Sequence, residues 1–200
     1  MLWSASVMPS MRGTEADDRL QDTKFASSHF SHTFFNFGPF ILPDPLAGLR
    51  ECHRILRSNG ILGFTTWQRV PWFAEYRAGI ARNTALSPFP SDAQLGKAFS
   101  ETPERWDNVD DVRSHFEGCG FADVDVRIAE NTTRMKGVSE VEAMLPYTLG
   151  MMISKFWTKE EVERYKRPAG EAVVEYIREK YKDGPVAWRW VSIVATGRKG

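Results

Sequence analysis

The sequence predicts an α/β fold in a single domain of 200 residues, and three observations support this prediction. Residues 30–67 have the pattern of a strand, a helix and a second strand. Residues 109–130 have the pattern of another helix followed by another strand. Residues 185–199 (PVAWRWVSIVATGRK) have the apolar and β-branched content of a long final strand.

The segment FFNFGPFILPDPLAGLRECHRILRSNGILGFTTW holds the clearest local signals. The aromatic-rich residues 30–36 predict a strand that ends in a turn. Asp44 followed by Pro45 predicts a helix start, with Asp as the cap and Pro at the first position. Gly60 is the expected left-handed stop of this helix. Residues 61–67 (ILGFTTW) then predict a buried parallel strand, and the crossover between the two strands is right-handed.

The rest of the chain predicts mostly helices. A helix is expected from Pro71 to Ala85, one over 109–121 with Gly118 or Gly120 at its end, and a half-buried strand over 121–130. The Met-rich residues 137–157 predict a helical lid. Thr158 to Glu161 forms a capping box that opens the last helix, which Pro168 should break or restart. The cap and lid segments of the single domain are residues 84–108 and 137–168, and residues 1–20 form an N-terminal arm.

Composition excludes several classes of protein. The sequence has 26 Lys and Arg and 26 Asp and Glu, so its formal net charge is zero. This balance argues against a nucleic-acid-binding protein, which usually carries a net positive charge. No stretch approaches the roughly 20 apolar residues of a membrane span. The N-terminus lacks the pattern of a secretory signal, and the two Cys suggest neither disulfides nor a metal site. The expected location is therefore the cytoplasm, with no metal.

The order of these parts resembles the second half of the class I S-adenosylmethionine-dependent methyltransferases. The resemblance rests on the aromatic strand, on the helix that carries Asp44, Pro45, Glu51 and Arg54, and on the strands that follow. It implies a truncated Rossmann-like methyltransferase sheet, mostly parallel with an antiparallel C-terminal strand, plus the helical lid. It covers roughly residues 17–200.

One part of the family pattern has no counterpart here. The family holds its cofactor with a glycine-rich turn, where backbone amides approach the cofactor, and with a carboxylate for the ribose hydroxyls. The sequence contains no G-x-G-x-G, and only about thirty residues precede the first strand. Three explanations remain open: an incomplete gene product, a site completed by a second chain, or a reduced scaffold with a different activity.

The first strand, residues 30–36, is expected to be a sheet edge, because its usual neighbour belongs to the part without a counterpart. An apolar edge strand favours association unless another segment covers it. The N-terminal arm is one candidate cover. Edge pairing between two copies is the other, and we expect a homodimer through this strand.

The expected ligand is an apolar small molecule, bound beyond the carboxyl ends of the strands. The predicted catalytic residues, as hydrogen-bonding or basic groups, are Tyr147, Asn36, Thr66 and His32. The predicted substrate pocket consists of Phe37, Phe40, Trp67, Trp72, Phe73, Tyr76, Met144, Met151 and Phe156. If the cofactor is bound, the resemblance implies Asp18, Asn36 and Gly38 as its contacts.

Three functions are compatible with these features. The first is an enzyme that has lost cofactor binding and acts by shape and hydrogen bonding on an apolar, natural-product-like substrate. It would be a cyclase or isomerase of the pericyclase kind, for which no cofactor is expected. The second is a small-molecule methyltransferase, fragmentary or completed by a partner chain, which would use S-adenosylmethionine. The third is a non-catalytic partner subunit.

Overall fold

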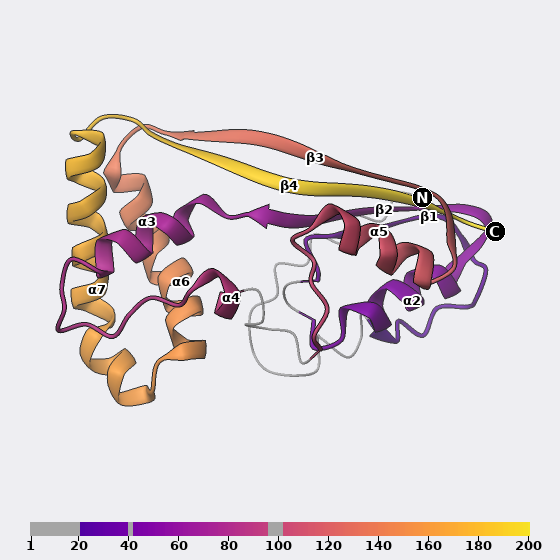
Figure 1. The fold of residues 1–200 in the computed structure, drawn as a ribbon, viewed down its shortest axis with the longest axis horizontal. Helices are drawn as coiled ribbons and strands as arrows, with labels where there is room; N and C mark the ends of the chain where they lie inside the picture. Colours follow the sequence, from indigo (N-terminus) through magenta and orange to yellow (C-terminus); the bar gives the residue numbers. More distant parts are fainter. Residues whose placement is uncertain (1–20, 40–41, 96–101) are drawn as a thin grey trace. The chain divides into compact units, whose positions relative to one another are not determined.

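The structure, a computed structural model, describes residues 21–39, 42–95 and 102–200 (Figure 1). Its elements are β1 (Phe30–Asn36), α2 (Pro45–Ile55), β2 (Leu56–Arg69), α3 (Pro71–Ile80), α4 (Asp92–Leu95), α5 (Val109–Gly118), β3 (Phe121–Met135), α6 (Val138–Phe156), α7 (Lys159–Tyr181) and β4 (Val186–Lys199). They form two compact units. The first contains the described residues among 1–69, 96–130 and 191–200, and the second contains residues 70–95 and 131–190.

The strands form one mixed sheet in the order β1-β2-β4-β3. β1 runs parallel to β2, and α2 makes the crossover between them. β4 runs antiparallel to β2, with Phe64 opposite Ala195. The predicted α/β fold, with a parallel pair and an antiparallel C-terminal strand, is therefore confirmed.

The core of the first unit lies between the sheet and two helices, α2 and α5, which lie together beside the strands (Figure 1). Phe64 of β2 is its centre, with ring centroids 5.5 Å from Phe35, 5.3 Å from Phe116 and 5.6 Å from Trp106. Edge-to-face contacts such as the first two add to the stabilisation from burial. These contacts fix the helix-covered face of β1 and β2.

α2 begins as the sequence predicts but ends differently. Asp44 caps it by accepting a hydrogen bond from the Ala47 amide at 2.9 Å, and Pro45 takes the first position. The helix ends at Ile55, and Leu56 is already extended. The prediction of Gly60 as the left-handed stop is wrong. The residue with positive φ nearby is Asn59, at 62° and already within β2, a value that Asn tolerates better than most residues.

The second unit packs α3, α6 and α7 alongside one another (Figure 1). α3 ends at Ile80 rather than at Ala85. The Thr158–Glu161 capping box is present. The prediction that Pro168 breaks the last helix is wrong, because α7 runs through it from Lys159 to Tyr181. Buried residues after the proline, which include Ala169 and Val173, pack this helix and outweigh the local cost.

The remaining elements differ from the predictions mainly in length. α5 ends at Gly118, and Gly120 just beyond it has a φ of 88°. β3 extends to Met135 rather than to residue 130, and both β3 and β4 contribute residues to each unit. The helix predicted over residues 137–157 is present as α6, and its role as a lid stays a prediction. No helix in the described part of the chain is both long and apolar enough to span a membrane.

Candidate functional site

The carboxyl ends of the two parallel strands, β1 and β2, form the candidate site. Asn36 is the last residue of β1 and lies opposite Thr65 of β2. The Thr65 hydroxyl donates a hydrogen bond to the Asn36 side-chain oxygen. Ligands of open α/β sheets bind beyond this end of the strands, so this polar pair marks the place where a ligand is expected.

Phe37 follows β1 in an unusual backbone conformation. Its φ is 51°, a left-handed value that costs a bulky residue of the order of 1–2 kcal/mol. Its amide donates to the Thr65 carbonyl at 2.9 Å and to the Thr65 hydroxyl oxygen at 3.0 Å, which offsets this cost. The turn places the Phe37 ring face to face with Trp67, with centroids 3.9 Å apart and an interplanar angle of 14°. Strain held in place by neighbours in this way is typical of binding sites.

Gly38 is required by packing. A Cβ at this position would lie 1.8 Å from the Phe35 ring, far inside van der Waals contact. The last residue of the turn Asn36-Phe37-Gly38 must therefore be a glycine, because only a residue without a side chain fits beside the Phe35 ring. This contact fixes the path of the chain after β1.

Thr66 points to the opposite face of β2 from its neighbours Thr65 and Trp67, because side chains alternate along a strand. It is fully buried, and among the described residues its hydroxyl oxygen finds no hydrogen-bond partner. A buried hydroxyl without a partner costs about 1–3 kcal/mol and is often explained by a ligand or a water molecule. Of the predicted catalytic residues, Thr66 therefore has the polar group most clearly in need of a partner.

The predicted residues of the second unit include a cluster of aromatic side chains. Trp72 and Tyr76 of α3 are buried, with ring centroids 4.9 Å apart, and Trp72 also contacts Phe73 at 4.5 Å. The Tyr76 hydroxyl lies 2.7 Å from the Thr148 hydroxyl of α6. Burial raises the pKa of Tyr76 to about 12, although the bond to Thr148 opposes the shift, so this phenol stays neutral.

α6 carries the other predicted residues of the second unit. Tyr147 is 55% exposed, Met144, Met151 and Phe156 are half-buried, and none of the four carries a charge. The strand-end residues Asn36, Phe37, Gly38, Thr66 and Trp67 all belong to the first unit. A single pocket that joins both sets stays a prediction.

The remaining predicted residues are placed as follows. His32 is exposed on β1, and its Nδ1 lies 3.1 Å from the Ser31 hydroxyl. Asp18 and Phe40 lie outside the described residues. No group of three or more His, Cys, Asp or Glu within the described ranges could hold a metal ion.

Sequence reasoning missed Thr148, the partner of Tyr76. It follows Tyr147 within a Met-rich helix and carries no signal of its own, because its role depends on a residue 72 positions earlier. It also missed the ion pair between Glu51 and Arg54, which share one helix face three residues apart. That spacing is a signal that could have been used.

Comparison with known proteins supports the resemblance. No family model matches the chain. A protein from Aspergillus fumigatus named methyltransferase tpcH is 33% identical over 183 residues, which cover 90% of this chain and 62% of that protein. The acetylaranotin bis-thiomethyltransferase of Aspergillus terreus is 29% identical over 182 residues, which cover 90% of this chain and 60% of that protein.

Among solved structures, the YcgJ protein from Bacillus subtilis is similar with a TM-score of 0.43 and 11% identity, over 90% of this chain and 68% of that chain. A likeness at this level supports no further conclusion. The chain spans about three-fifths of the length of these two curated relatives. Over that length, the chain is similar to proteins named as methyltransferases, in agreement with the resemblance described from the sequence.

Proposed function

We propose that the chain acts in the S-adenosylmethionine-dependent methylation of an apolar small molecule, and that the ends of β1 and β2 contact the cofactor. The observation that carries this proposal is the Phe37–Trp67 stack at the carboxyl ends of two parallel strands. It occurs in a chain that is 33% identical to a protein named as a methyltransferase. Relatives that are methyltransferases also support an enzymatic role in general.

The residues at the strand ends fit one side of this cofactor. S-adenosylmethionine supplies a methyl group on a positively charged sulfur. A cation is attracted to an aromatic face by about 0.5–2 kcal/mol, and the Phe37–Trp67 pair offers such a surface. Asn36 uses its side-chain oxygen for Thr65, which leaves its amide nitrogen as the donor toward a ligand. The family's ribose-binding carboxylate has no counterpart among these strand-end residues.

The acceptor is proposed to be apolar because the strand-end side chains of Phe37 and Trp67 are aromatic. Within the second unit, α6 carries Met144 and Met151, half-buried apolar side chains of a kind that adapts to irregular ligands. The name of one relative specifies methylation of thiols. Apolar thiols are therefore the first acceptors to test.

A cofactor-independent cyclase or isomerase is the competing candidate, and a sequence observation favours it. The 200 residues contain no G-x-G-x-G turn, so binding of S-adenosylmethionine by this chain depends on other contacts. In that case the aromatic residues would hold a flexible apolar substrate, and the Asn36 side-chain amide would donate to its carbonyl. The non-catalytic partner subunit binds neither ligand.

Calorimetric titration of the purified chain with S-adenosylmethionine separates these functions. We expect a dissociation constant tighter than about 100 µM, which corresponds to about 5.5 kcal/mol. Transfer of a labelled methyl group to an apolar thiol should follow. No binding up to about 1 mM (about 4 kcal/mol) would contradict methyl transfer by this chain and would favour the cofactor-independent reading.

A further inference from the structure

β1 is an edge strand of the sheet. One of its edges pairs with β2 along most of its length, from His32 opposite Ile61 to Asn36 opposite Thr65. Among the described residues no strand pairs with its other edge, because β1 stands first in the order β1-β2-β4-β3. Such an edge presents a row of backbone donors and acceptors that can accept another strand.

The two edge strands of the sheet differ in charge. β3, at the far edge, carries five charged residues along its length: Asp123, Asp125, Arg127, Glu130 and Arg134. Charged side chains are a common protection against pairing with a further strand. β1 (FSHTFFN) contains no Asp, Glu, Lys or Arg in seven residues. This sheet therefore has one edge with that protection and one without it.

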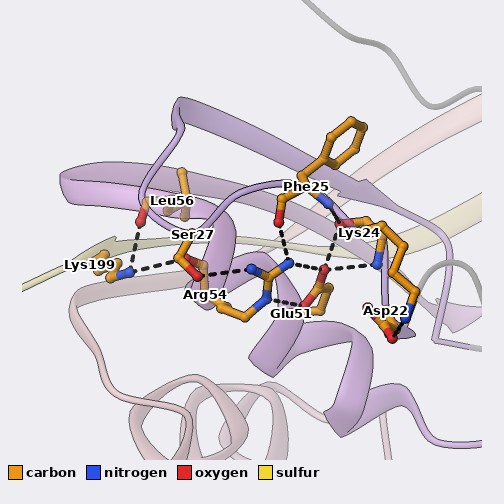
Figure 2. Close-up of polar contacts among 9 residues, drawn as sticks. Asp22, Lys24, Phe25, Ser27, Glu51, Arg54, Leu56 and Lys199 are labelled. Carbon is orange, nitrogen blue, oxygen red and sulfur yellow. Dashed lines mark hydrogen bonds and ion pairs between the residues drawn. The ribbon is translucent and has the colours of Figure 1, made fainter.

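The segment just ahead of β1 is bound to α2. Arg54 donates two hydrogen bonds of 2.7 Å to the Glu51 carboxylate, one from Nε and one from Nη2 (Figure 2). Glu51 is 6% exposed, and it also accepts hydrogen bonds from the Thr23 amide at 2.9 Å and the Thr23 hydroxyl at 2.6 Å. A buried carboxylate with four donors is a stable anchor. It holds the start of the strap (residues 22–29) against α2.

The rest of the strap is held in the same way. Arg54 donates to the Phe25 carbonyl at 2.7 Å and to the Ser27 hydroxyl at 2.9 Å (Figure 2). The Ser28 amide then donates to the Arg54 carbonyl at 3.0 Å, and the His29 amide to the Ile55 carbonyl at 2.8 Å. These two bonds tie the residues just ahead of β1 to the last two residues of α2. The strap is therefore committed to the α2 and β2 side and does not cover the opposite edge of β1.

We propose that the open edge of β1 pairs with β1 of a second copy of this chain, antiparallel across a twofold axis. Charge favours this occupant. A strand that meets itself about a twofold axis risks placing like charges opposite each other, and β1 has none to oppose. Phe34, 49% exposed on β1, would supply apolar contact with its counterpart. This inference does not depend on the proposed function.

Sedimentation equilibrium of the 200-residue chain tests the pairing. We expect a species of twice the chain mass of 22.8 kDa. Phe34→Lys, which places a charge on the edge, should raise the dissociation constant of the dimer at least about tenfold. Ile128→Lys is the matched control, because Ile128 is also 49% exposed and lies on the other edge strand. It should leave the dimer unchanged.

A second variant guards against misfolding, because the Phe34 ring lies over Gly63, where an added Cβ would be 2.8 Å from it. His32 is exposed on the same strand, and His32→Glu should also weaken the dimer while circular dichroism stays unchanged. A monomeric wild-type chain would overturn the proposal and would favour the N-terminal residues as the cover. A dimer lost in Ile128→Lys but kept in both β1 variants would overturn it equally.

Discussion

Phe37 and Trp67 stack face to face with 3.9 Å between their ring centroids, although they come from different strand ends. The stack depends on the left-handed φ of Phe37, which the two hydrogen bonds from its amide to Thr65 maintain. The aromatic surface proposed to meet a cationic cofactor is therefore built by the backbone turn after β1. Changes to that turn should affect both folding and binding.

Gly38→Ala should destabilise the first unit. The new Cβ would lie 1.8 Å from the Phe35 ring, so the core must move, at a cost of about 2–4 kcal/mol. Urea unfolding measures the loss. Gly118→Ala is the control, because a Cβ there meets nothing within 4 Å, and the change at the end of α5 should be neutral or mildly stabilising. Equal stability of the two variants would contradict the packing role of Gly38.

Glu51→Gln should remove part of the pH dependence of stability. The Arg54 guanidinium, helped by Thr23 and opposed by burial, lowers the pKa of Glu51 from 4.5 to about 2. Because the unfolded chain takes up this proton at higher pH than the folded chain, the stabilisation is complete above pH 4.5 and is lost as the pH falls toward 2. It amounts to about 2–3 kcal/mol, discounted because the Arg54 side chain is 38% exposed.

Chemical denaturation between pH 2 and 7 checks this prediction. The wild-type chain should lose stability more steeply below pH 4.5 than Glu51→Gln. The control is Glu171→Gln in the Arg167–Glu171 pair, whose side chains are 90% and 63% exposed. It should change stability by less than about 0.5 kcal/mol. Parallel pH profiles for the wild-type chain and Glu51→Gln would refute the role assigned to the Glu51–Arg54 pair.

Thr66→Val should leave the fold intact or stabilise it by up to about 1 kcal/mol, because the buried Thr66 hydroxyl has no partner among the described residues. Thr65→Val, by contrast, removes a hydroxyl that bonds Asn36 and the Phe37 amide, and should cost about 1–2 kcal/mol. Thermal unfolding distinguishes them. If Thr66 serves a ligand, its variant should also bind that ligand more weakly. Destabilisation by Thr66→Val would point to a structural hydroxyl instead.

Tyr76→Phe should lower the free energy of unfolding by about 1 kcal/mol at pH 7, through loss of the bond to Thr148. Burial raises the pKa of Tyr76 from 10.0 to about 12, so the unfolded chain loses this proton first. The stabilisation from a neutral phenol is complete below pH 10 and is lost as the pH rises toward 12. In urea titrations, the free energy of unfolding should fall less between pH 7 and pH 11 in Tyr76→Phe than in the wild-type chain. Tyr147→Phe, at an exposed position, should behave like the wild-type chain.

Local signals explain what could be predicted from the sequence. Asp44 and Pro45 define the start of α2 because capping depends only on neighbouring residues, and the Thr158–Glu161 box is equally local. The prediction for Pro168 was wrong because the helix-breaking effect of proline is local, whereas the packing that stabilises α7 is a tertiary interaction. The prediction for Gly60 was wrong because α2 already ends at Ile55 and the chain enters β2 at Leu56, without a left-handed residue at the helix end.

The candidate site was predictable only in part, for a similar reason. The positions of Asn36 and Thr66 follow from strand ends, which periodicity locates. The Phe37–Trp67 stack depends on the register between β1 and β2 and on the φ of Phe37. Neither can be predicted from the local sequence pattern. The bond between Tyr76 and Thr148 spans 72 residues, so only the folded unit reveals it.

The most direct test of the proposed function compares S-adenosylmethionine with S-adenosylhomocysteine, the product whose sulfur carries no charge, by calorimetry on the wild-type chain and on Trp67→Ala. If the Phe37–Trp67 surface meets the sulfonium, Trp67→Ala should weaken binding of S-adenosylmethionine about tenfold, or about 1.4 kcal/mol. Binding of S-adenosylhomocysteine should weaken much less. Equal losses for both compounds, or no binding of either by the wild-type chain, would contradict the proposal.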